Sequence, residues 1–579
     1  MTKDRGRGIR AYHWAEDDRS LLYIQDTGGD ENWRVYQVDL LEGSIRDLTP
    51  HPGAQAQLVG TSPELPDELL VALNVRDKRL HDVYRVSLRT GESRLDTENP
   101  GDVTGWLADS RLRVRACKAA LPDGGSRLRA RDDERAPWRD IVTWGPDDSG
   151  GAVSFAPGDR TLYVESSLGA DTTRLLELDL AGATVRELAR YAEVDVGPVV
   201  LHPRTYALQA VGFNADRLEW MVLDPAVADD FARLGASGEG DFQLLSRDDE
   251  DRQWVVLYNS DRKPPRYFLY RRDGLGGGSL DFLFSTRPAI ERFALAEMRP
   301  VRFTASDGLR IRGYLTLPPG VEPRGLPMVL LVHGGPWVRD SWGWQPEAQW
   351  LSNRGFAVLQ VNYRGSAGFG KAYLHAGDRE WGARMQEDLT EAVRWAAGNG
   401  VADPARVAIF GGSYGGYAAL AGAAFTPGVY ACAVDIVGPS NLETLIRSIP
   451  PYWEPMRRIF DLRVGNVDTE AEFLRSRSPL FAADRIAIPL LIAQGANDPR
   501  VKVAESEAIV AALRAAGKSV EYVLFPDEGH GFARPENRLR FYRQAEEFLE
   551  RHLGGRKATP EAPGPLDARL PAGEARDMT

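Results

Sequence analysis

Residues 406–425 read RVAIFGGSYGGYAALAGAAF and decide the fold of the second half of the chain. Residues 406–410 form an apolar strand pattern, residues 417–425 form an alanine-rich helix pattern, and Ser413 lies in the glycine-rich turn between them. Glycines two positions before and two positions after this serine relieve crowding in a tight, strained turn. The stretch therefore predicts a nucleophile elbow, which lifts the serine hydroxyl above the edge of a sheet.

The residues around this turn alternate between apolar strands and helical patterns. Near-continuous apolar runs, typical of strands buried on both faces, occur at 329–332, 357–361, 407–410, 433–437, 490–493 and 520–525. Helical periodicity separates them at 381–397, 417–425, 504–516 and 536–552. This alternation predicts a doubly wound α/β sheet over residues 296–555.

The first half of the chain has a different pattern, made of short strands and turns. Stretches 21–50, 69–98 and 162–189 resemble one another, and their turns VYQVDLLEG, VYRVSLRTG and LLELDLAG end at Gly43, Gly91 and Gly182. The glycines are 48 and then 91 positions apart, close to one and two periods of a strand repeat. Residues 1–295 are therefore predicted to form a β-propeller of six or seven blades, about six of which are visible in the sequence. The alternative is a pair of β-sandwiches.

Composition narrows the classes of protein. Hydrophobic residues make up 43% of the 579 positions and charged residues 27%, the balance of a soluble globular chain. A net charge of −12 and the lack of a long apolar run argue against nucleic acid or a membrane as partner, and the two cysteines favour a cytoplasmic location. The proline-rich segment 556–579 is predicted to be a disordered tail.

A serine nucleophile needs a histidine base and an acid, which follow it in the order serine, acid, histidine in this kind of fold. Of the eight histidines, His530 and His552 follow Ser413. His530 lies in a glycine-flanked loop directly after the strand at 520–525, whereas His552 lies near the end of a helix. His530 is therefore the predicted base.

Three aspartates compete for the role of the acid by chain order. Asp498 follows the strand at 490–493, at the carboxyl edge where α/β folds place their sites. Asp484 precedes its strand, and Asp527 is only three residues from His530. The prediction is Asp498.

Two backbone N–H groups are candidates for an oxyanion hole. One belongs to Tyr414 at the start of the predicted helix, and the other to Gly335 in HGGP, which follows the strand at 329–332. Two glycines let the backbone approach an acyl oxygen closely. His333 precedes the serine, so we interpret it as a structural residue that holds this loop by a short-range hydrogen bond.

With GGSYGGY, HGGPW, NYRGSAGFG, GANDPRV and DEGHGF behind a propeller, the chain resembles the prolyl oligopeptidase family of serine peptidases, near its acylaminoacyl-peptidase and dipeptidyl-peptidase-like bacterial branches. The resemblance implies an α/β-hydrolase domain capped by a propeller that acts as a size filter. It implies a Ser413–Asp498–His530 triad and no metal or cofactor. It also implies that Arg500 holds a substrate carbonyl or carboxylate, and that Val501, Tyr452 and Trp453 line the substrate pocket.

Two features depart from the family pattern. Phe369 stands where prolyl-specific members carry an oxyanion-hole tyrosine, which favours the Gly335 route and moves the prediction away from strict proline specificity. The chain also begins directly on a repeat, so an incomplete ring is expected to widen substrate entry or to expose edges that a partner subunit in a homo-oligomer would cover. The pair Asp30–Glu31 is interpreted as a solvated turn rather than as a site for a substrate amine.

The leading hypothesis is a serine peptidase that acts on short peptides through an acyl-enzyme, of the acylaminoacyl-peptidase or oligopeptidase type. An esterase or amidase for small acyl compounds is an alternative, because a triad does not by itself read the leaving group. A propeller interaction protein with an inert hydrolase half is a third.

Overall fold

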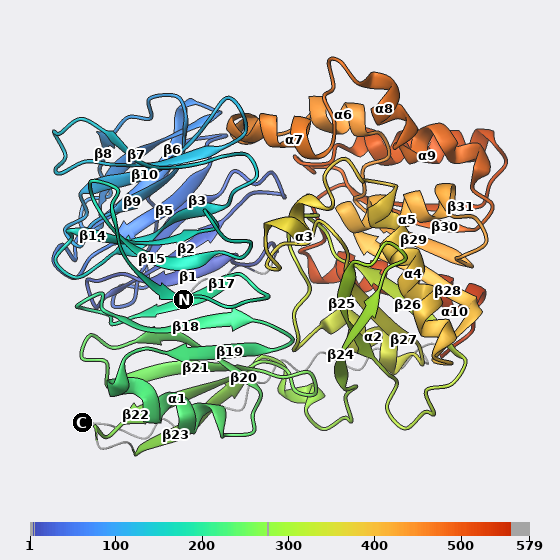
Figure 1. Cartoon of the computed structure of the whole chain (residues 1–579), viewed down its shortest axis with the longest axis horizontal. Coiled ribbons are helices and arrows are strands. Elements are labelled where there is room, and N and C mark those ends of the chain that lie inside the picture. Colours follow the sequence, from blue (N-terminus) through green and yellow to red (C-terminus); the bar gives the residue numbers. More distant parts are fainter. Residues whose placement is uncertain (1–3, 5, 275–276, 557–579) are drawn as a thin grey trace.

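The structure is a computed structural model that describes residue 4 and residues 6–274 and 277–556. The chain forms two domains side by side, a β-propeller and an α/β domain (Figure 1). The predicted disordered tail lies, from residue 557 onward, outside the described residues. Within the described part of the chain no helix is long and apolar enough to span a membrane.

The described residues of the first half form six antiparallel sheets, each one blade of the propeller, which confirms the predicted architecture. The first three blades are β1–β4 (Ala11–Trp14, Ser20–Gln25, Arg34–Asp39, Ile45–Asp47), β5–β8 (Ala56–Thr61, Glu68–Asp77, Leu80–Ser87, Ser93–Thr97) and β9–β12 (Val103–Ala108, Val114–Ala120, Ser126–Ala130, Arg139–Trp144). The last three are β13–β16 (Gly150–Phe155, Thr161–Ser166, Arg174–Asp179, Thr184–Ala189), β17–β19 (Val196–Leu201, Leu208–Asn214, Leu218–Val222) and β20–β23 (Asp241–Arg247, Gln253–Asn259, Arg266–Arg272, Gly278–Ser285).

The repeated glycines occupy the same turn in three blades. Gly43, Gly91 and Gly182 each lie between the third and fourth strands, with φ angles of 66°, 78° and 89°. A positive φ in this range favours glycine because it has no Cβ. The period seen in the sequence is therefore the period of this hairpin.

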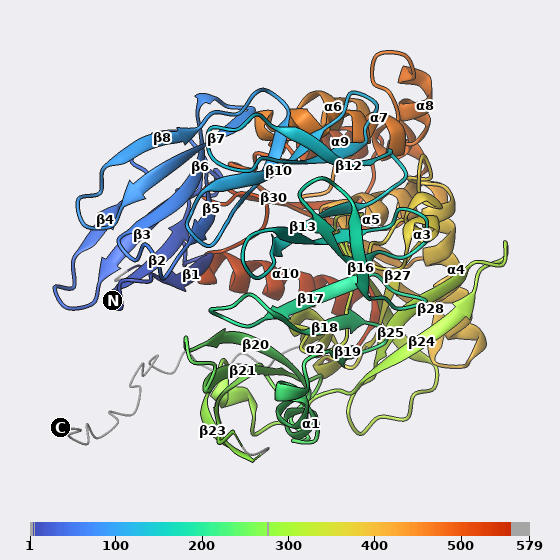
Figure 2. The same cartoon turned by 60° about the vertical axis from the view of Figure 1, so that its left-hand side comes forward.

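Buried apolar clusters join each blade to the next along the chain, from the first to the sixth. In the fifth blade the helix α1 (Ala228–Gly235) follows the third strand and packs Phe231 and Leu234 against the sixth blade. Among the described residues no such cluster joins the sixth blade to the first, and Tyr12 and Trp14 of β1 are 65% and 57% exposed. Figure 2 shows the first blade in blue and the sixth blade in green.

The α/β domain contains one eight-stranded sheet in the order β24-β25-β27-β26-β28-β29-β30-β31. The pairs β24–β25 and β25–β27 are antiparallel and the others are parallel. Its strands are β24 (Met298–Thr304), β25 (Arg310–Thr316), β26 (Leu326–Val332), β27 (Ala357–Asn362), β28 (Ala402–Gly412), β29 (Cys432–Ile436), β30 (Leu490–Gly495) and β31 (Val520–Phe525). Every residue of β27 and β30 is buried, as expected for strands covered on both faces.

Helices cover both faces of this sheet. One apolar cluster packs α4, α5 and α9 on one face, and a second packs α2 and α10 on the other. The helices are α2 (Pro346–Asn353), α3 (Lys371–His375), α4 (Arg384–Gly398), α5 (Tyr414–Phe425), α6 (Leu442–Arg447), α7 (Arg457–Arg463), α8 (Ala471–Ser476), α9 (Val503–Ala515) and α10 (Pro535–Leu553). The 3-10 turns are η1 (Pro225–Val227), η2 (Pro288–Ile290), η3 (Pro451–Met456) and η4 (Pro479–Arg485).

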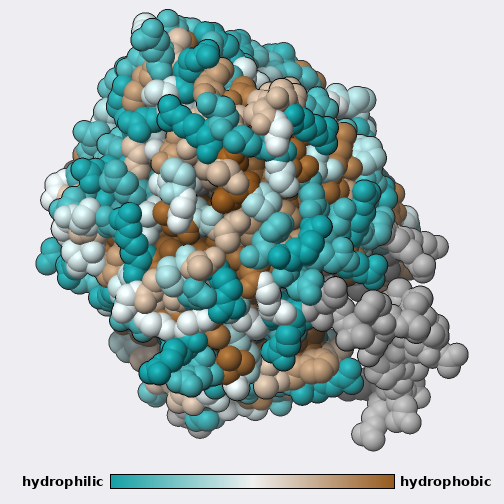
Figure 3. Space-filling view, turned by 90° about the vertical axis from the view of Figure 1, so that its right-hand side faces the viewer, coloured by the Kyte–Doolittle hydropathy of each residue, from teal (hydrophilic) through white to brown (hydrophobic). Residues whose placement is uncertain are grey.

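The face of this domain turned away from the propeller is mainly hydrophilic at its rim, with apolar residues near its centre (Figure 3).

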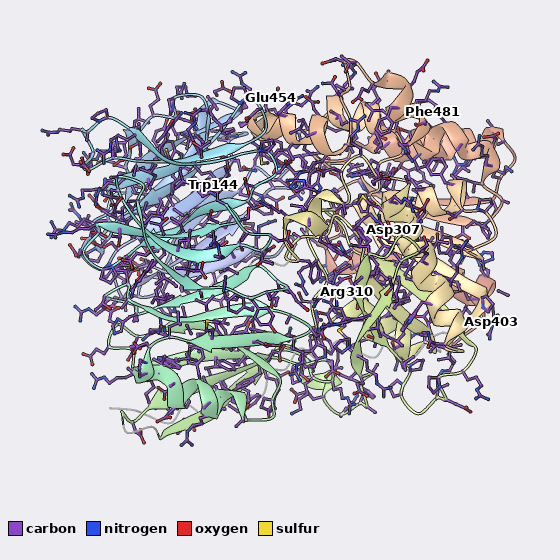
Figure 4. All side chains as sticks on the ribbon, viewed as in Figure 1. Trp144, Asp307, Arg310, Asp403, Glu454 and Phe481 are labelled. Atoms are coloured by element: carbon purple, nitrogen blue, oxygen red, sulfur yellow. The ribbon has the colours of Figure 1, made fainter. Side chains whose placement is uncertain are left out.

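Several contacts join the two domains. In α3, the Lys371 ammonium lies 2.8 Å from the carboxylate of Asp148, which precedes the fourth blade. A Cβ placed on Gly124, in the third blade, would lie 2.6 Å from Leu462 Cδ1 of α7. Figure 4 shows Glu454, in η3 just before α7, at this junction. Segments near the carboxyl ends of the α/β strands are thus in direct contact with the propeller.

Candidate active site

Ser413 lies between β28 and α5 with φ 59° and ψ −120°, a strained conformation for a residue with a side chain. The neighbouring glycines are required by close backbone packing. A Cβ on Gly411 would lie 2.5 Å from Gly415 C, and one on Gly415 would lie 2.2 Å from Val332 O. The turn therefore has the geometry that the sequence predicts for a nucleophile elbow.

The structure brings Ser413, His530 and Asp498 together from three segments of the chain. The distance from His530 Nε2 to Ser413 Oγ is 3.0 Å, and the distance from His530 Nδ1 to Asp498 Oδ2 is 2.7 Å. An ionised carboxylate can only accept a hydrogen bond, so His530 Nδ1 carries a proton and donates it to Asp498. His530 Nε2 then presents a lone pair to the Ser413 hydroxyl. The arrangement can transfer the serine proton to the histidine.

The carboxylate of Asp498 is fixed by backbone groups that follow it. Its Oδ1 accepts hydrogen bonds from the N–H groups of Arg500 at 2.8 Å and Val501 at 3.0 Å, while Oδ2 faces His530. The side chain of Asp498 is fully buried. The rival Asp527 instead pairs with Arg534 and accepts from Asn537, and Asp484 is exposed.

The HGGP loop lies against the serine. A Cβ on Gly334 would lie 3.1 Å from Gly412 O and 3.4 Å from Ser413 Cβ, so a side chain at this position would crowd the backbone beside the serine. Gly335 has φ 109°, which favours glycine. The N–H of Tyr414, as the first residue of α5, has no acceptor within its own helix. Gly334 thus lies against Ser413, and the predicted donor N–H of Tyr414 directly follows the serine at the start of α5.

His333 makes the short-range hydrogen bond that the sequence predicts. Its Nδ1 lies 2.8 Å from Gly334 O, and its Nε2 lies 3.0 Å from Ser366 Oγ. Because a carbonyl oxygen only accepts, the contact with Gly334 O requires Nδ1–H as the donor. The Ser366 hydroxyl donates to Tyr363 O at 2.6 Å, so its oxygen holds the Nε2 edge of the ring by proximity. Burial lowers the pKa of His333 to about 4, so the ring is neutral at pH 7.

This contact orients the predicted oxyanion donor. The C=O of Gly334 and the N–H of Gly335 belong to one planar peptide unit, so a hydrogen bond that fixes the carbonyl also fixes the direction of the N–H. We therefore interpret His333 as a positioning residue for Gly335, with no part in proton transfer.

We expect His333→Ala to lower kcat by about 10- to 100-fold, less than the loss of an oxyanion donor, because Gly335 N–H remains but is no longer held in place. The measurement is steady-state hydrolysis of a short peptide, with the melting temperature as a check on folding. His552→Ala is the control, since His552 packs on Phe548 in α10, and it should stay within about twofold of the wild type. A wild-type kcat for His333→Ala would contradict the positioning role.

The four residues predicted to contact substrate have different surroundings. Arg500 Nε donates to Glu31 Oε2 at 2.9 Å, and its guanidinium lies 5.6 Å from the ring of Trp453. The Tyr452 hydroxyl donates to the same Glu31 oxygen at 3.0 Å. Val501 is only 4% exposed and belongs to the core, so little of its side chain is available to a substrate in this structure.

Glu31 corrects one interpretation made from the sequence. The solvated-turn interpretation of Asp30–Glu31 is wrong for Glu31, which is 6% exposed and has φ 55°, an unusual backbone conformation for glutamate. Its carboxylate lies beside Arg500, whose own N–H binds the triad aspartate. Nothing near residue 31 in the sequence signals this, because the partners are more than 400 residues away.

Phe369, the residue that replaces the oxyanion tyrosine, lies at the interface of the two domains. It is buried in the cluster that joins the fourth and fifth blades, with Arg339 4.0 Å from its ring centroid. A phenyl ring has no hydrogen-bond donor, so it offers nothing to an oxyanion.

A six-bladed propeller packed on an α/β sheet, with a serine elbow facing a histidine and an aspartate, defines a two-domain serine hydrolase. Residues 342–556 match the prolyl oligopeptidase family. The chain is 44% identical over 572 residues to dipeptidyl aminopeptidase BIII of Pseudoxanthomonas mexicana, which covers 96% of this chain and 82% of that protein.

Two further comparisons agree. The chain is 34% identical over 607 residues to dipeptidyl peptidase family member 6 of Caenorhabditis elegans, covering 97% of this chain and 81% of that protein. A solved prolyl endopeptidase structure has the same fold, with a TM-score of 0.78 at 16% identity over 96% of this chain and 83% of that one. The chain belongs to the prolyl oligopeptidase family and is a serine-type peptidase, as its motifs indicate.

Proposed function

We propose that this peptidase removes dipeptides from the free amino terminus of short peptides, with Ser413 as nucleophile, His530 as general base and Asp498 as the orienting acid. The observation that carries the proposal is the buried carboxylate of Glu31, which a propeller loop presents beside Arg500 and the triad aspartate. The similarity to a dipeptidyl aminopeptidase over 96% of the chain supports it.

The geometry supports an acyl-enzyme mechanism. His530 Nε2 takes the proton of Ser413 Oγ as the oxygen attacks the scissile carbonyl, and Asp498 stabilises the imidazolium that forms. The N–H groups of Gly335 and Tyr414 hold the developing oxyanion. His530 then gives its proton to the leaving amine, and water hydrolyses the ester by the same steps.

Glu31 suits the ammonium group of a peptide. Within the described part of the chain both hydrogen bonds to its carboxylate are made by Oε2, and Oε1 accepts none. A carboxylate buried in a site of low dielectric attracts an ammonium group strongly. An acetylated amino terminus carries no charge and gains nothing there.

The propeller supplies the restriction to short peptides in this proposal. Its loop at residues 28–31 lies directly on the loop of His530, since a Cβ on Gly29 would lie 2.3 Å from Gly529 N. A folded protein cannot bring its backbone to Ser413 past such a cover, whereas a short flexible peptide can.

An acylaminoacyl peptidase is the second candidate, favoured by the HGGP loop beside Ser413 and by the phenylalanine at position 369. It would release one acylated residue rather than a dipeptide. The esterase and the inert-propeller hypotheses become the leading ones only if neither kind of peptide is cleaved.

Glu31→Gln should lower kcat/KM about 10- to 100-fold for peptides with a free amino terminus, because the charge-assisted hydrogen bond to the ammonium is lost. For the same peptides with an acetylated terminus the change should stay within about threefold. The measurement is kcat/KM for matched peptide pairs.

The control for this substitution is Asp30→Asn in the same loop, whose carboxylate bonds to Asn32 and Thr27 rather than to the site. It should leave both substrates nearly unchanged. An equal loss for free and acetylated peptides in Glu31→Gln would count against a role in amine binding.

A further inference from the structure

A buried cluster of charged groups joins the amino-terminal segment of the chain to the loop that carries His530. Arg7 Nη1 lies 2.9 Å from Glu528 Oε2, and Arg7 Nε lies 2.8 Å from Asp26 Oδ1. The side chains of Asp26 and Glu528 are fully buried and that of Arg7 is 17% exposed. Residues 521 positions apart therefore share one cluster next to the candidate active site.

Glu528 spans the loop of His530. Its Oε2 accepts the N–H of Ala533 at 3.0 Å, and its Oε1 accepts the N–H of Arg534 at 2.8 Å. The carboxylate therefore closes the segment from residue 528 to residue 534, with His530 inside it. Oε2 also accepts from Arg7, and Oε1 also accepts from Asn537 Nδ2 at 3.0 Å. Each carboxylate oxygen therefore accepts two hydrogen bonds, which is a full use of the ionised form.

Arg7 balances the charge of this carboxylate. A buried carboxylate without a cation is costly, and the group then takes up a proton or the structure around it rearranges. A protonated Glu528 would have one oxygen that donates, and this oxygen would face a backbone N–H. Burial opposes the charge of Arg7, but the hydrogen bond and the charge of Asp26 raise its pKa above the usual value.

The backbone around His530 has no freedom to absorb such a change. A Cβ on Gly529 would lie 2.1 Å from Gly29 O of the propeller, and a Cβ on Gly495 would lie 2.1 Å from Gly529 O. The loop is thus held between the propeller on one side and the end of β30 on the other. The hydrogen bond from Asn497 N–H to Glu528 O and the Glu528 clamp add to this support.

We propose that Arg7 is a positioning residue for His530, because its ion pair with Glu528 fixes the carboxylate that spans the His530 loop and so holds this loop in register with Ser413. The inference rests on the proposed role of His530 as the general base. It makes the amino-terminal segment a part of the catalytic apparatus, although no atom of Arg7 touches substrate.

The test compares Arg7→Met and Arg7→Lys with Arg34→Met and His530→Ala in the full chain. Arg34 is the matched control, since it pairs with Asp47 at 3.2 Å within the first blade rather than with a residue of the His530 loop. The readout is the rate constant for labelling of Ser413 by a fluorophosphonate probe across pH 5–9, together with the melting temperature. Labelling by this probe needs the base but not the carboxylate of Glu31. This matters because the backbone N–H of Glu31 donates to Asp26 at 3.3 Å, and Asp26 is a partner of Arg7.

We expect Arg7→Met to label about 10- to 100-fold more slowly with an altered pH profile, as is typical when a catalytic group is displaced by a fraction of an ångström to one ångström. Arg7→Lys, which keeps the charge but reaches only one carboxylate, should recover most of the rate, and Arg34→Met should stay within about twofold of the wild type.

The inference is overturned if Arg7→Met folds and labels at the wild-type rate with the wild-type pH profile, or if Arg34→Met slows labelling as much. Should Arg7→Met fail to fold, Arg7→Gln, which removes the charge but keeps a hydrogen-bond donor, is measured in its place and judged by the same criterion. The His530→Ala variant distinguishes an incorrect role for Arg7 from an incorrect assignment of His530 as the base. If it labels normally, His530 is not the base; if it does not label, the proposed base stands whatever the Arg7 variants do.

Discussion

Ser413→Ala should reduce kcat for short peptides by about 10⁵- to 10⁶-fold, because it removes the nucleophile. The hydroxyl that approaches His530 Nε2 at 3.0 Å is the protein group that forms the covalent bond to the substrate in the proposed mechanism. The melting temperature should hardly change, since alanine meets the same backbone strain as serine at φ 59°. Steady-state kinetics and thermal unfolding measure both quantities.

The control for this substitution is Ser476→Ala on α8, an exposed serine whose hydroxyl bonds only to the local carbonyl of Phe473. It should retain wild-type kcat. Peptidase activity that survives in Ser413→Ala, with no contaminating enzyme, would show that another residue is the nucleophile.

Asp498→Asn should lower kcat by about 10⁴-fold, because it changes which ring nitrogen of His530 carries the proton. Its Oδ1 accepts the N–H groups of Arg500 and Val501, so an asparagine there must place its carbonyl on that side. The amide NH₂ then points at His530 Nδ1, which has to accept. The proton moves to Nε2, where it blocks uptake of the serine proton.

Asp527→Asn is the matched control, because Asp527 was the rival by chain order and instead pairs with Arg534. It should keep kcat within about threefold of the wild type. A larger loss for Asp527→Asn than for Asp498→Asn would reverse the assignment of the acid.

The parts of the fold that repeat or alternate locally can be predicted from the sequence. The hairpin glycines recur at the blade period because each needs a positive φ, and the α/β strands appear as apolar runs because they are covered on both faces. The order of Ser413, Asp498 and His530 follows from strand ends, and the structure places these residues within hydrogen-bond reach of one another.

Contacts between segments far apart in the chain produce no local repeat or alternation in the sequence. The polar sequence around Glu31 indicates a solvated turn, whereas Tyr452 and Arg500 cover this residue from the other domain. The backbone N–H of Val501 holds the triad aspartate, and its side chain packs in the core. Arg7 and Glu528 pair across 521 positions, a distance over which no local periodicity operates.

The proposed dipeptidyl aminopeptidase activity can be tested by mass spectrometry of the products from short peptides that differ only in having a free or an acetylated amino terminus, with Ser413→Ala as the blank. We expect release of a dipeptide from the free peptides, little cleavage of the acetylated ones, and none by Ser413→Ala. Release of a single acetylated residue, with the free peptides left intact, would contradict it and identify an acylaminoacyl peptidase instead.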